Sequence, residues 1–309
     1  MGRCGMHRAY YLAALKLDCD FDLPGLLPWD GPATVPADVV FRLGRVPTRL
    51  EMPDHLAAIF QTRGRSEYLL ALPGTARFLV RDGSQVTIEL EPGADRNSTR
   101  AILAGPIQAV LWHQRGLLPL HANAVLVNGR AVALAGPTAS GKSTLAAVLA
   151  AMGHQPIADD VCVVDAHVGA ECAVLPGSPV LRLWRDTLDH LGIAAEGLPR
   201  ALSEKEQFFV DRSERFLREP QKLAAVVLLL RRSSGALTIE RLHGPDAVGA
   251  LHRVVHTRRP ARALGRDPEI FFALTRLLAA RVTVWRLRVP DDLACLSEAA
   301  SKVLAMLEA

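Results

Sequence analysis

A complete G-x-x-x-x-G-K-[ST] pattern occupies positions 136–143 and is followed by a threonine, so that nine consecutive residues read Gly136, Pro137, Thr138, Ala139, Ser140, Gly141, Lys142, Ser143 and Thr144. An apolar run at 131–135 precedes it and an Ala/Leu-rich run at 144–151 follows it, which predicts the order strand, loop, helix. In such a loop, backbone N–H groups and the helix N-terminus converge on an anionic phosphate. Lys142 would reach the β- and γ-phosphates, and the Ser143 hydroxyl would hold Mg²⁺. We therefore expect these nine residues to bind the phosphates of ATP with Mg²⁺.

A pair of adjacent carboxylates, Asp159 and Asp160, follows Lys142 by 17 and 18 residues. Phosphoryl transfer uses one carboxylate to hold Mg²⁺ and often another to accept the proton of the attacking hydroxyl. The run 157–164 has the composition of a strand, in which adjacent side chains point to opposite faces. That alternation favours divided roles for the two aspartates. An exposed acidic pair at the start of a strand is the alternative.

His121 is the third candidate, because it precedes a pair of apolar runs, 122–127 and 131–135, joined by Asn128-Gly129. This pattern predicts a hairpin that returns the chain to the phosphate loop. A histidine beside a base carboxylate orients it or tunes its pKa. A structural or solvated histidine is the alternative.

The order of elements predicts two domains. Residues 1–96 look β-rich and small, with strand-like runs at 39–43, 77–80 and 85–90 and an Asp82-Gly83 hairpin signal between the last two. From 98 to 114 apolar residues recur at helical spacing, and Asn97 or Ser98 can cap that helix. We place the boundary at 96/97, with an α/β catalytic domain built on a mixed sheet over 97–309.

Composition excludes several classes of function. The formal net charge is only +4 over 309 residues, without the basic and aromatic interleaving of a nucleic-acid surface. Neither a signal sequence nor an uninterrupted apolar stretch of membrane-spanning length is present, so we expect a cytoplasmic protein without a membrane partner. The five cysteines are odd in number and lack C-x-x-C spacing, which favours reduced thiols over disulfides or a zinc site.

Three segments together carry a resemblance: 120–125 with His121, the loop at 136–144, and 153–161 with Asp159-Asp160. They look like the catalytic domain of the bacterial HPr serine kinase/phosphorylase family. They resemble still more the shorter HPr-kinase-like proteins found with ribosomally made peptides, including lasso-peptide kinases. The resemblance implies an HPr-kinase-like fold that uses ATP and Mg²⁺, and it leaves a homo-oligomer open. It is close over about residues 115–165.

The resemblance also implies a role for each residue. Lys142 and the loop amides would bind ATP phosphates, and Ser143 would ligate Mg²⁺. Asp159 matches the position that activates the acceptor serine, and Asp160 the neighbouring carboxylate near metal or acceptor. His121 matches the family histidine close to the base. The family order therefore predicts Asp159, Asp160, His121 and Lys142 as catalytic, and Ser143 with Asp160 as metal ligands.

The pattern departs from the family at 176–184. The bifunctional enzymes carry a Glu-Ile-Arg-Gly type segment whose glutamate helps to bind metal, whereas this stretch has no carboxylate. We therefore expect a one-way kinase whose substrate is not HPr. Within the stretch, Arg182 and Trp184 would contact nucleotide or acceptor; the alternative places Trp184 in the core and Arg182 on the surface.

Two further groups of residues have the composition of ligand-binding sites. A basic stretch contains Arg253, Arg258, Arg259, Arg262 and Arg266. It would supply an arginine finger, dock a peptide carboxylate or form a solvated loop. His252 and His256 lie one helical turn apart but lack the intervening glutamate of a zinc protease, so we expect no metal site there.

These observations predict an ATP-dependent kinase acting on a serine of a peptide or protein. The specific expectation is tailoring of a ribosomally made precursor, such as a lasso peptide, at its C-terminal serine. A P-loop small-molecule kinase and a protein that senses ATP without transferring phosphate are the alternatives.

Overall fold

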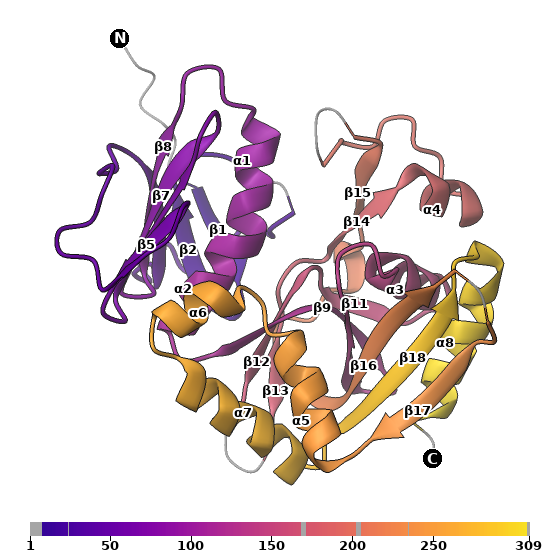
Figure 1. Cartoon of the computed structure of the whole chain (residues 1–309). Helices are drawn as coiled ribbons and strands as arrows, with labels where there is room; N and C mark the ends of the chain where they lie inside the picture. The colour runs from indigo at the N-terminus through magenta and orange to yellow at the C-terminus, as the bar shows by residue number, and fades with distance from the viewer. Residues whose placement is uncertain (1–7, 24, 168–170, 202–204, 234, 308–309) are drawn as a thin grey trace. The chain divides into compact units, whose positions relative to one another are not determined.

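The computed structural model describes residues 8–23, 25–167, 171–201, 205–233 and 235–307. Within them the chain forms a mixed α/β structure that divides into two compact units. Unit 1 comprises the chain up to Leu117 together with Thr257–Glu269, and unit 2 comprises Leu118–His256 and the chain from Ile270 onward (Figure 1). The units thus divide at 117/118 instead of the expected 96/97, because the helical segment after residue 96 packs with the N-terminal strands.

Unit 1 is built on an eight-stranded sheet of order β1-β2-β3-β8-β7-β6-β5-β4. Its strands are β1 (Arg8–Leu12), β2 (Leu15–Cys19), β3 (Val39–Leu43), β4 (His55–Leu56), β5 (Phe60–Arg63), β6 (Glu67–Leu72), β7 (Ala76–Arg81) and β8 (Gln85–Leu90). Strand β3 pairs in parallel with β2 and β8, and the other neighbours are antiparallel. The hairpin expected at Asp82-Gly83 is confirmed as the β7–β8 turn, where both residues have positive φ.

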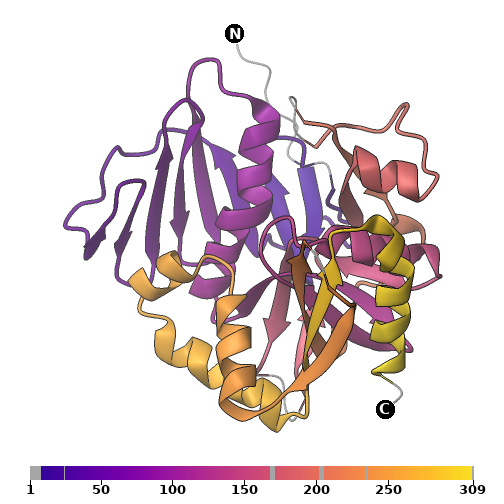
Figure 2. The same cartoon turned by 45° about the vertical axis from the view of Figure 1, so that its right-hand side comes forward.

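Helices α1 (Arg96–Ile102), α2 (Gln108–Gln114) and α6 (Arg258–Ala263) complete unit 1, with α1 and α2 crossing the sheet in Figure 2. The expected single helix over 98–114 is interrupted by a π-helical segment, Leu103–Ile107, that contains Pro106. Proline lacks an N–H and clashes with the preceding turn, so the helix widens there. The expected cap was also wrong. Asp95 caps α1, and its side chain accepts from the backbone N–H groups of Asn97 and Ser98.

Unit 2 contains a mixed sheet of order β10-β9-β12-β13-β16-β18-β17, in which β10 also pairs with β16 and β11 pairs with β9. Its strands are β9 (Leu118–Val127), β10 (Arg130–Ala135), β11 (Gln155–Ala158), β12 (Val161–Asp165), β13 (Ala173–Leu175), β16 (Gln221–Arg232), β17 (Thr238–Leu242) and β18 (Thr283–Pro290). A separate two-stranded sheet pairs β14 (Val180–Trp184) with β15 (Gln207–Asp211). The predicted hairpin at Asn128-Gly129 is confirmed, since β9 and β10 are antiparallel with Val127 opposite Arg130.

The helices of unit 2 are α3 (Lys142–Ala151), α4 (Arg185–His190), α5 (Gly244–Arg253), α7 (Asp267–Ala279), whose first turn belongs to unit 1, and α8 (Leu296–Ala305). Buried side chains of α3 and α8 pack with alternate residues of β9, β10, β16 and β18 and with the β14–β15 sheet in one hydrophobic cluster. Helices α5 and α7 lie on the other side of the sheet from α8 (Figures 1 and 2). This core fixes α3 against the strands that carry the candidate residues.

No helix among the described residues combines the length and apolar character needed to span a bilayer.

Candidate active site

The 136–144 segment links β10 to α3 through backbone conformations that ordinary side chains resist. A Cβ on Gly136 would lie 2.7 Å from both the backbone oxygen of Leu229 and the Ser140 Oγ. Ala139 and Gly141 have positive φ values of 64° and 91°. Gly141 is the N-cap of α3 and supplies no side-chain cap, so the first N–H groups of the helix remain directed at the loop. This is the arrangement that binds phosphate.

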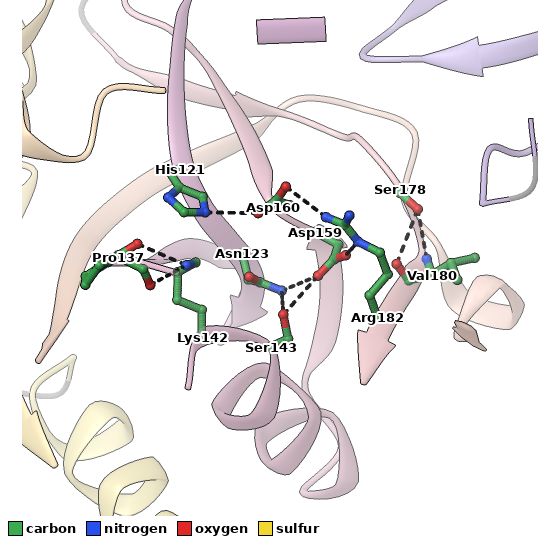
Figure 3. A network of polar contacts seen from close by, with 11 residues as sticks. His121, Asn123, Pro137, Lys142, Ser143, Asp159, Asp160, Ser178, Val180 and Arg182 are labelled. Carbon is green, nitrogen blue, oxygen red and sulfur yellow. Dashed lines mark hydrogen bonds and ion pairs between the residues drawn. The ribbon is translucent and has the colours of Figure 1, made fainter. Parts of the chain in front are cut away.

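Lys142 begins α3, and its side chain folds back over the loop. Its Nζ donates to the carbonyl oxygens of Gly136 at 2.9 Å and Pro137 at 3.0 Å (Figure 3). Burial lowers the pKa of Lys142, and the charges of Asp160 and Asp159 oppose that effect. The ammonium is thus held where the loop would receive an anion.

The two aspartates lie in a break between strands. The continuous strand expected over 157–164 is wrong: β11 ends at Ala158 and β12 begins at Val161. Asp160 has φ 67°, and Val161 N donates to Asp159 O at 2.8 Å across it, closing a tight turn. Aspartate tolerates the left-handed region better than most residues. The turn removes strand alternation, so both carboxylates reach the same cation.

That cation is Arg182 on β14. Its Nε donates to Asp159 Oδ2 at 2.9 Å, and a terminal nitrogen lies 2.9 Å from Asp160 Oδ2 (Figure 3). The sequence alternative of a core Trp184 and a surface Arg182 is reversed, because Trp184 is 44% exposed and Arg182 joins the aspartates. The pairs formed with both carboxylates raise the pKa of Arg182 despite its burial, so the guanidinium stays charged.

The remaining contacts divide the two aspartates. Asp160 Oδ1 lies 3.0 Å from Nε2 of His121, a residue of β9. Asp159 Oδ1 accepts from Asn123 Nδ2 at 2.6 Å and lies 3.4 Å from the Ser143 Oγ. His121 therefore belongs with Asp160, and Ser143 with Asp159.

The electrostatic environments of the two carboxyls also differ. Burial raises the pKa of Asp159 and outweighs the lowering effects of Arg182 and Asn123. Burial also acts to raise the pKa of Asp160, but the His121 hydrogen bond and the Arg182 charge outweigh it and hold that pKa well below its usual range. Asp160 is consequently ionised at neutral pH.

The donor set fits a magnesium ion that is shared with phosphates. The described residues contain no group of three or more His, Cys, Asp or Glu side chains arranged for a metal. Mg²⁺ instead takes one or two protein carboxylates, water and substrate phosphates. The Ser143 hydroxyl beside the Asp159 carboxylate, at the phosphate-facing end of α3, suits that role. The contact joins Ser143 to Asp159 and not to Asp160, so the expected Ser143–Asp160 ligand pair stays a prediction.

The other loop residues fall into two groups. Pro137, Thr138 and Ala139 are exposed, as residues that meet an incoming ligand must be, whereas Ser140 is buried beneath them. The Thr144 hydroxyl lies 3.2 Å from that of Thr187, a contact that ties α3 to α4. The contact contributes to packing between the two helices, and phosphate binding by Thr144 stays a prediction.

Sequence reasoning assigned no role to two residues beside this cluster. Asn123 is fully buried on β9 and binds Asp159; its place two residues after His121, on the same strand face, was the available signal. His256, set aside as part of a rejected metal pair, lies with its ring centroid 5.2 Å from that of His121. Its partner in that pair, His252, is exposed.

The basic stretch is split between the units. Arg253 ends α5 in unit 2, and the arginines from 258 to 266 belong to unit 1. Within unit 1, Arg262 pairs with Asp267, and Arg266 with Glu269. Arg258 and Arg259 are exposed on α6.

Comparisons with known proteins leave the family of this chain open. No protein-family model and no curated protein matches it. Among solved structures, it is similar to the HPr(Ser) kinase/phosphatase from Coxiella burnetii, with 12% sequence identity and a TM-score of 0.33 over 62% of this chain and 99% of that one. A similarity this low does not assign the chain to that family.

Replacing Gly136 with Ala should damage the loop. The added Cβ overlaps a backbone oxygen of β16, and such overpacking costs about 1–3 kcal/mol. If the loop must take up this cost to bind nucleotide, affinity falls by about fivefold to 150-fold, measurable by calorimetry with a non-hydrolysable ATP analogue. Gly249→Ala is the control, because a Cβ there meets only the end of the Arg253 side chain at 3.8 Å. Equal affinity in both variants would contradict the loop geometry.

Replacing Arg182 with Ala should destabilise the fold in a pH-dependent way. Removing one partner of a buried ion pair costs about 3–5 kcal/mol. Without the guanidinium, the pKa of each carboxyl rises in the folded state, so the folded variant binds more protons than its unfolded chain and gains stability as pH falls. Urea unfolding should give this variant a lower free energy of unfolding than wild type at pH 7.5, and the difference should be smaller at pH 5.

Lys302→Ala is the matched control for that experiment. It breaks an exposed pair with Glu298 on α8, at 3.5 Å, and should change stability by about 0.5 kcal/mol or less at either pH. A pH-independent deficit in the Arg182 variant would mean that the guanidinium does not compensate the two carboxylates.

Proposed function

We propose that this chain is an ATP-dependent kinase that transfers the γ-phosphoryl group to a serine hydroxyl of a peptide or protein. The observation that carries the proposal is the convergence of Ser143 and Lys142 from the loop with Asp159 and Asp160 in one polar cluster (Figure 3). Phosphoryl transfer needs a loop that binds the phosphates, a carboxylate that holds the metal ion and a group that accepts the hydroxyl proton.

The peptide acceptor is proposed from the order of motifs. His121 before the loop and Asp159-Asp160 shortly after it resemble the HPr-kinase-like enzymes, and among these the peptide-tailoring kinases. On that resemblance, a C-terminal serine of a ribosomally made precursor, such as a lasso peptide, is the acceptor to test first.

In this mechanism the loop amides, the N-terminus of α3 and Lys142 bind the triphosphate. Ser143 and Asp159 would hold Mg²⁺, which neutralises charge on the β- and γ-phosphates. Asp160 accepts the proton of the serine hydroxyl as its oxygen attacks the γ-phosphorus in line. The bond from the γ-phosphorus to the bridging oxygen then breaks, and ADP leaves.

Access favours Asp160 over Asp159 as the base, which reverses the roles expected from the resemblance. A base must reach the proton that it removes, and geometry ranks before pKa in choosing one. The Asp159 side chain is 4% exposed and enclosed by Arg182, Asn123 and Ser143. Asp160 is 26% exposed and is oriented by His121. The pKa values favour Asp159, because its pKa is raised and that of Asp160 is lowered, but an acceptor has little access to a group as enclosed as Asp159.

Transfer in one direction is part of the proposal. The segment 176–184 carries no carboxylate, and its residue nearest the aspartates is Arg182, a cation. A second acidic ligand for metal, of the kind that the phosphorylase reaction uses in the family it resembles, is therefore missing from that segment.

Incubation with γ-labelled ATP and Mg²⁺ tests the function directly. Acceptors should include serine-terminated peptides, the same peptides with alanine in place of serine, and small hydroxylated metabolites. We expect label on serine peptides alone and none with the Lys142→Ala variant, which loses the phosphate-binding cation. Label on a metabolite would instead indicate a small-molecule kinase, and ATP binding without turnover would indicate a nucleotide sensor; either result overturns the proposal.

The two aspartates should separate kinetically when each is replaced by asparagine. Asp160→Asn should lower kcat by about 10²–10⁴-fold while leaving ATP binding intact, because it removes the proton acceptor. Asp159→Asn should chiefly raise the Mg²⁺ concentration needed for half-maximal rate, because it removes a metal ligand. The opposite pattern would restore Asp159 as the base.

A further inference from the structure

The segment that follows α5 adds a short strand-like edge to β9 beside His121. His121 N donates to Val254 O at 2.7 Å, and His256 N donates to Pro119 O at 2.9 Å. Between them, Leu120 and Val255 form an antiparallel bridge. Backbone hydrogen bonds therefore fix the position of residue 256 relative to β9, independently of its side chain.

The two imidazole rings meet edge to face. Their centroids are 5.2 Å apart and their planes are inclined by 71°. Edge-to-face contact is one of the preferred arrangements of paired aromatic rings. The second side-chain torsion of histidine is otherwise broad, so a lone ring on a strand turns easily. Packing against His256 thus restricts the ring plane of His121.

The orientation of the His121 ring matters because a single ring nitrogen makes the contact with Asp160. Its Nε2 lies 3.0 Å from Asp160 Oδ1, and this contact helps to hold the Asp160 carboxylate beside Arg182. A turned ring would lose that hydrogen bond and leave Asp160 held by Arg182 alone.

His256 is also the last residue of unit 2 before the chain crosses to unit 1. Thr257, the first residue of the 257–269 segment, has φ 48°, a conformation that a β-branched residue rarely adopts. The residue that makes the ring contact with His121 is therefore followed directly by one whose backbone conformation is strongly restricted.

We propose that His256 is a positioning residue for phosphoryl transfer, which holds the His121 ring in the plane that orients the Asp160 carboxylate. The proposal rests on the kinase function proposed above. It assigns no contact with substrate to His256. Its effect on the reaction passes through His121 and Asp160.

Three substitutions separate the ring contact from simple filling of space. His256→Ala removes the ring, His256→Leu keeps apolar volume without a ring, and His256→Phe keeps an aromatic ring without ionisable nitrogen. We expect Ala and Leu to lower kcat by about tenfold or more, since small misplacement of a catalytic group is costly. Phe should restore most of the rate. The KM for ATP, the affinity for a non-hydrolysable analogue and the Tm should stay near wild type in all three.

Several outcomes would overturn the proposal: an unchanged kcat in the Ala variant, rescue by Leu as complete as by Phe, or loss of ATP affinity in parallel with kcat. A second pattern would also count against the proposal. In it, the Tm falls in the Ala and Leu variants but not in the Phe variant, and kcat falls together with Tm although the assay is run well below every Tm. The role of His256 would then be structural. Failure of the proposed function is distinguishable, since the wild-type chain itself would then transfer no phosphate to any serine peptide.

Discussion

The candidate site depends on one cation placed between two consecutive carboxylates. Asp159 and Asp160 both pair with the Arg182 guanidinium at 2.9 Å, and Asp159 is nearly enclosed. Two such carboxylates would otherwise repel each other in surroundings that screen charge poorly, and one would take up a proton. With the guanidinium between them, each oxygen atom has a defined partner. Arg182 thus allows two adjacent aspartates to be held in different surroundings, each with its own contacts.

The pairing of Arg182 with the two aspartates requires several strands to be in the right positions. Arg182 reaches the aspartates from β14, whose neighbouring residues Leu181 and Leu183 are buried in the cluster that holds α3. The turn between β11 and β12 swings Asp160 back from the strand direction, and β9 runs beside both strands. Because His121 and Asn123 lie two residues apart on β9, one strand face serves both carboxylates. The hydrophobic core therefore sets the registers on which the polar geometry depends.

The sequence predicted the parts with strong local signals. Gly-rich spacing gave the loop, and Asn128-Gly129 gave the hairpin before it, because backbone conformation there is set by a few residues. It did not predict the break at Asp159-Asp160, since apolar composition on both sides outweighed a turn that tertiary pairing with Arg182 stabilises. Spacing singled out Arg182 as a contact for nucleotide or acceptor, but it could not pair that residue with the aspartates, of which Asp160 lies 22 residues earlier. Nor could it bring His256 to His121, 135 residues earlier. These long-range contacts depend on strand pairing, which no local pattern specifies.

A buried cluster of this kind is hard to explain by stability. Desolvating two carboxylates and a guanidinium costs several kcal/mol per ion, and apolar side chains of similar volume often stabilise a fold equally well. Carboxyl groups with strongly shifted pKa values are instead concentrated at functional sites. With both aspartates ionised, the two carboxylates and Arg182 together carry one net negative charge, and Ser143 at the start of α3 lies beside one of them. A divalent cation binds where a protein carboxylate faces phosphate oxygens, so the arrangement that costs stability is the one that the proposed phosphoryl transfer would use.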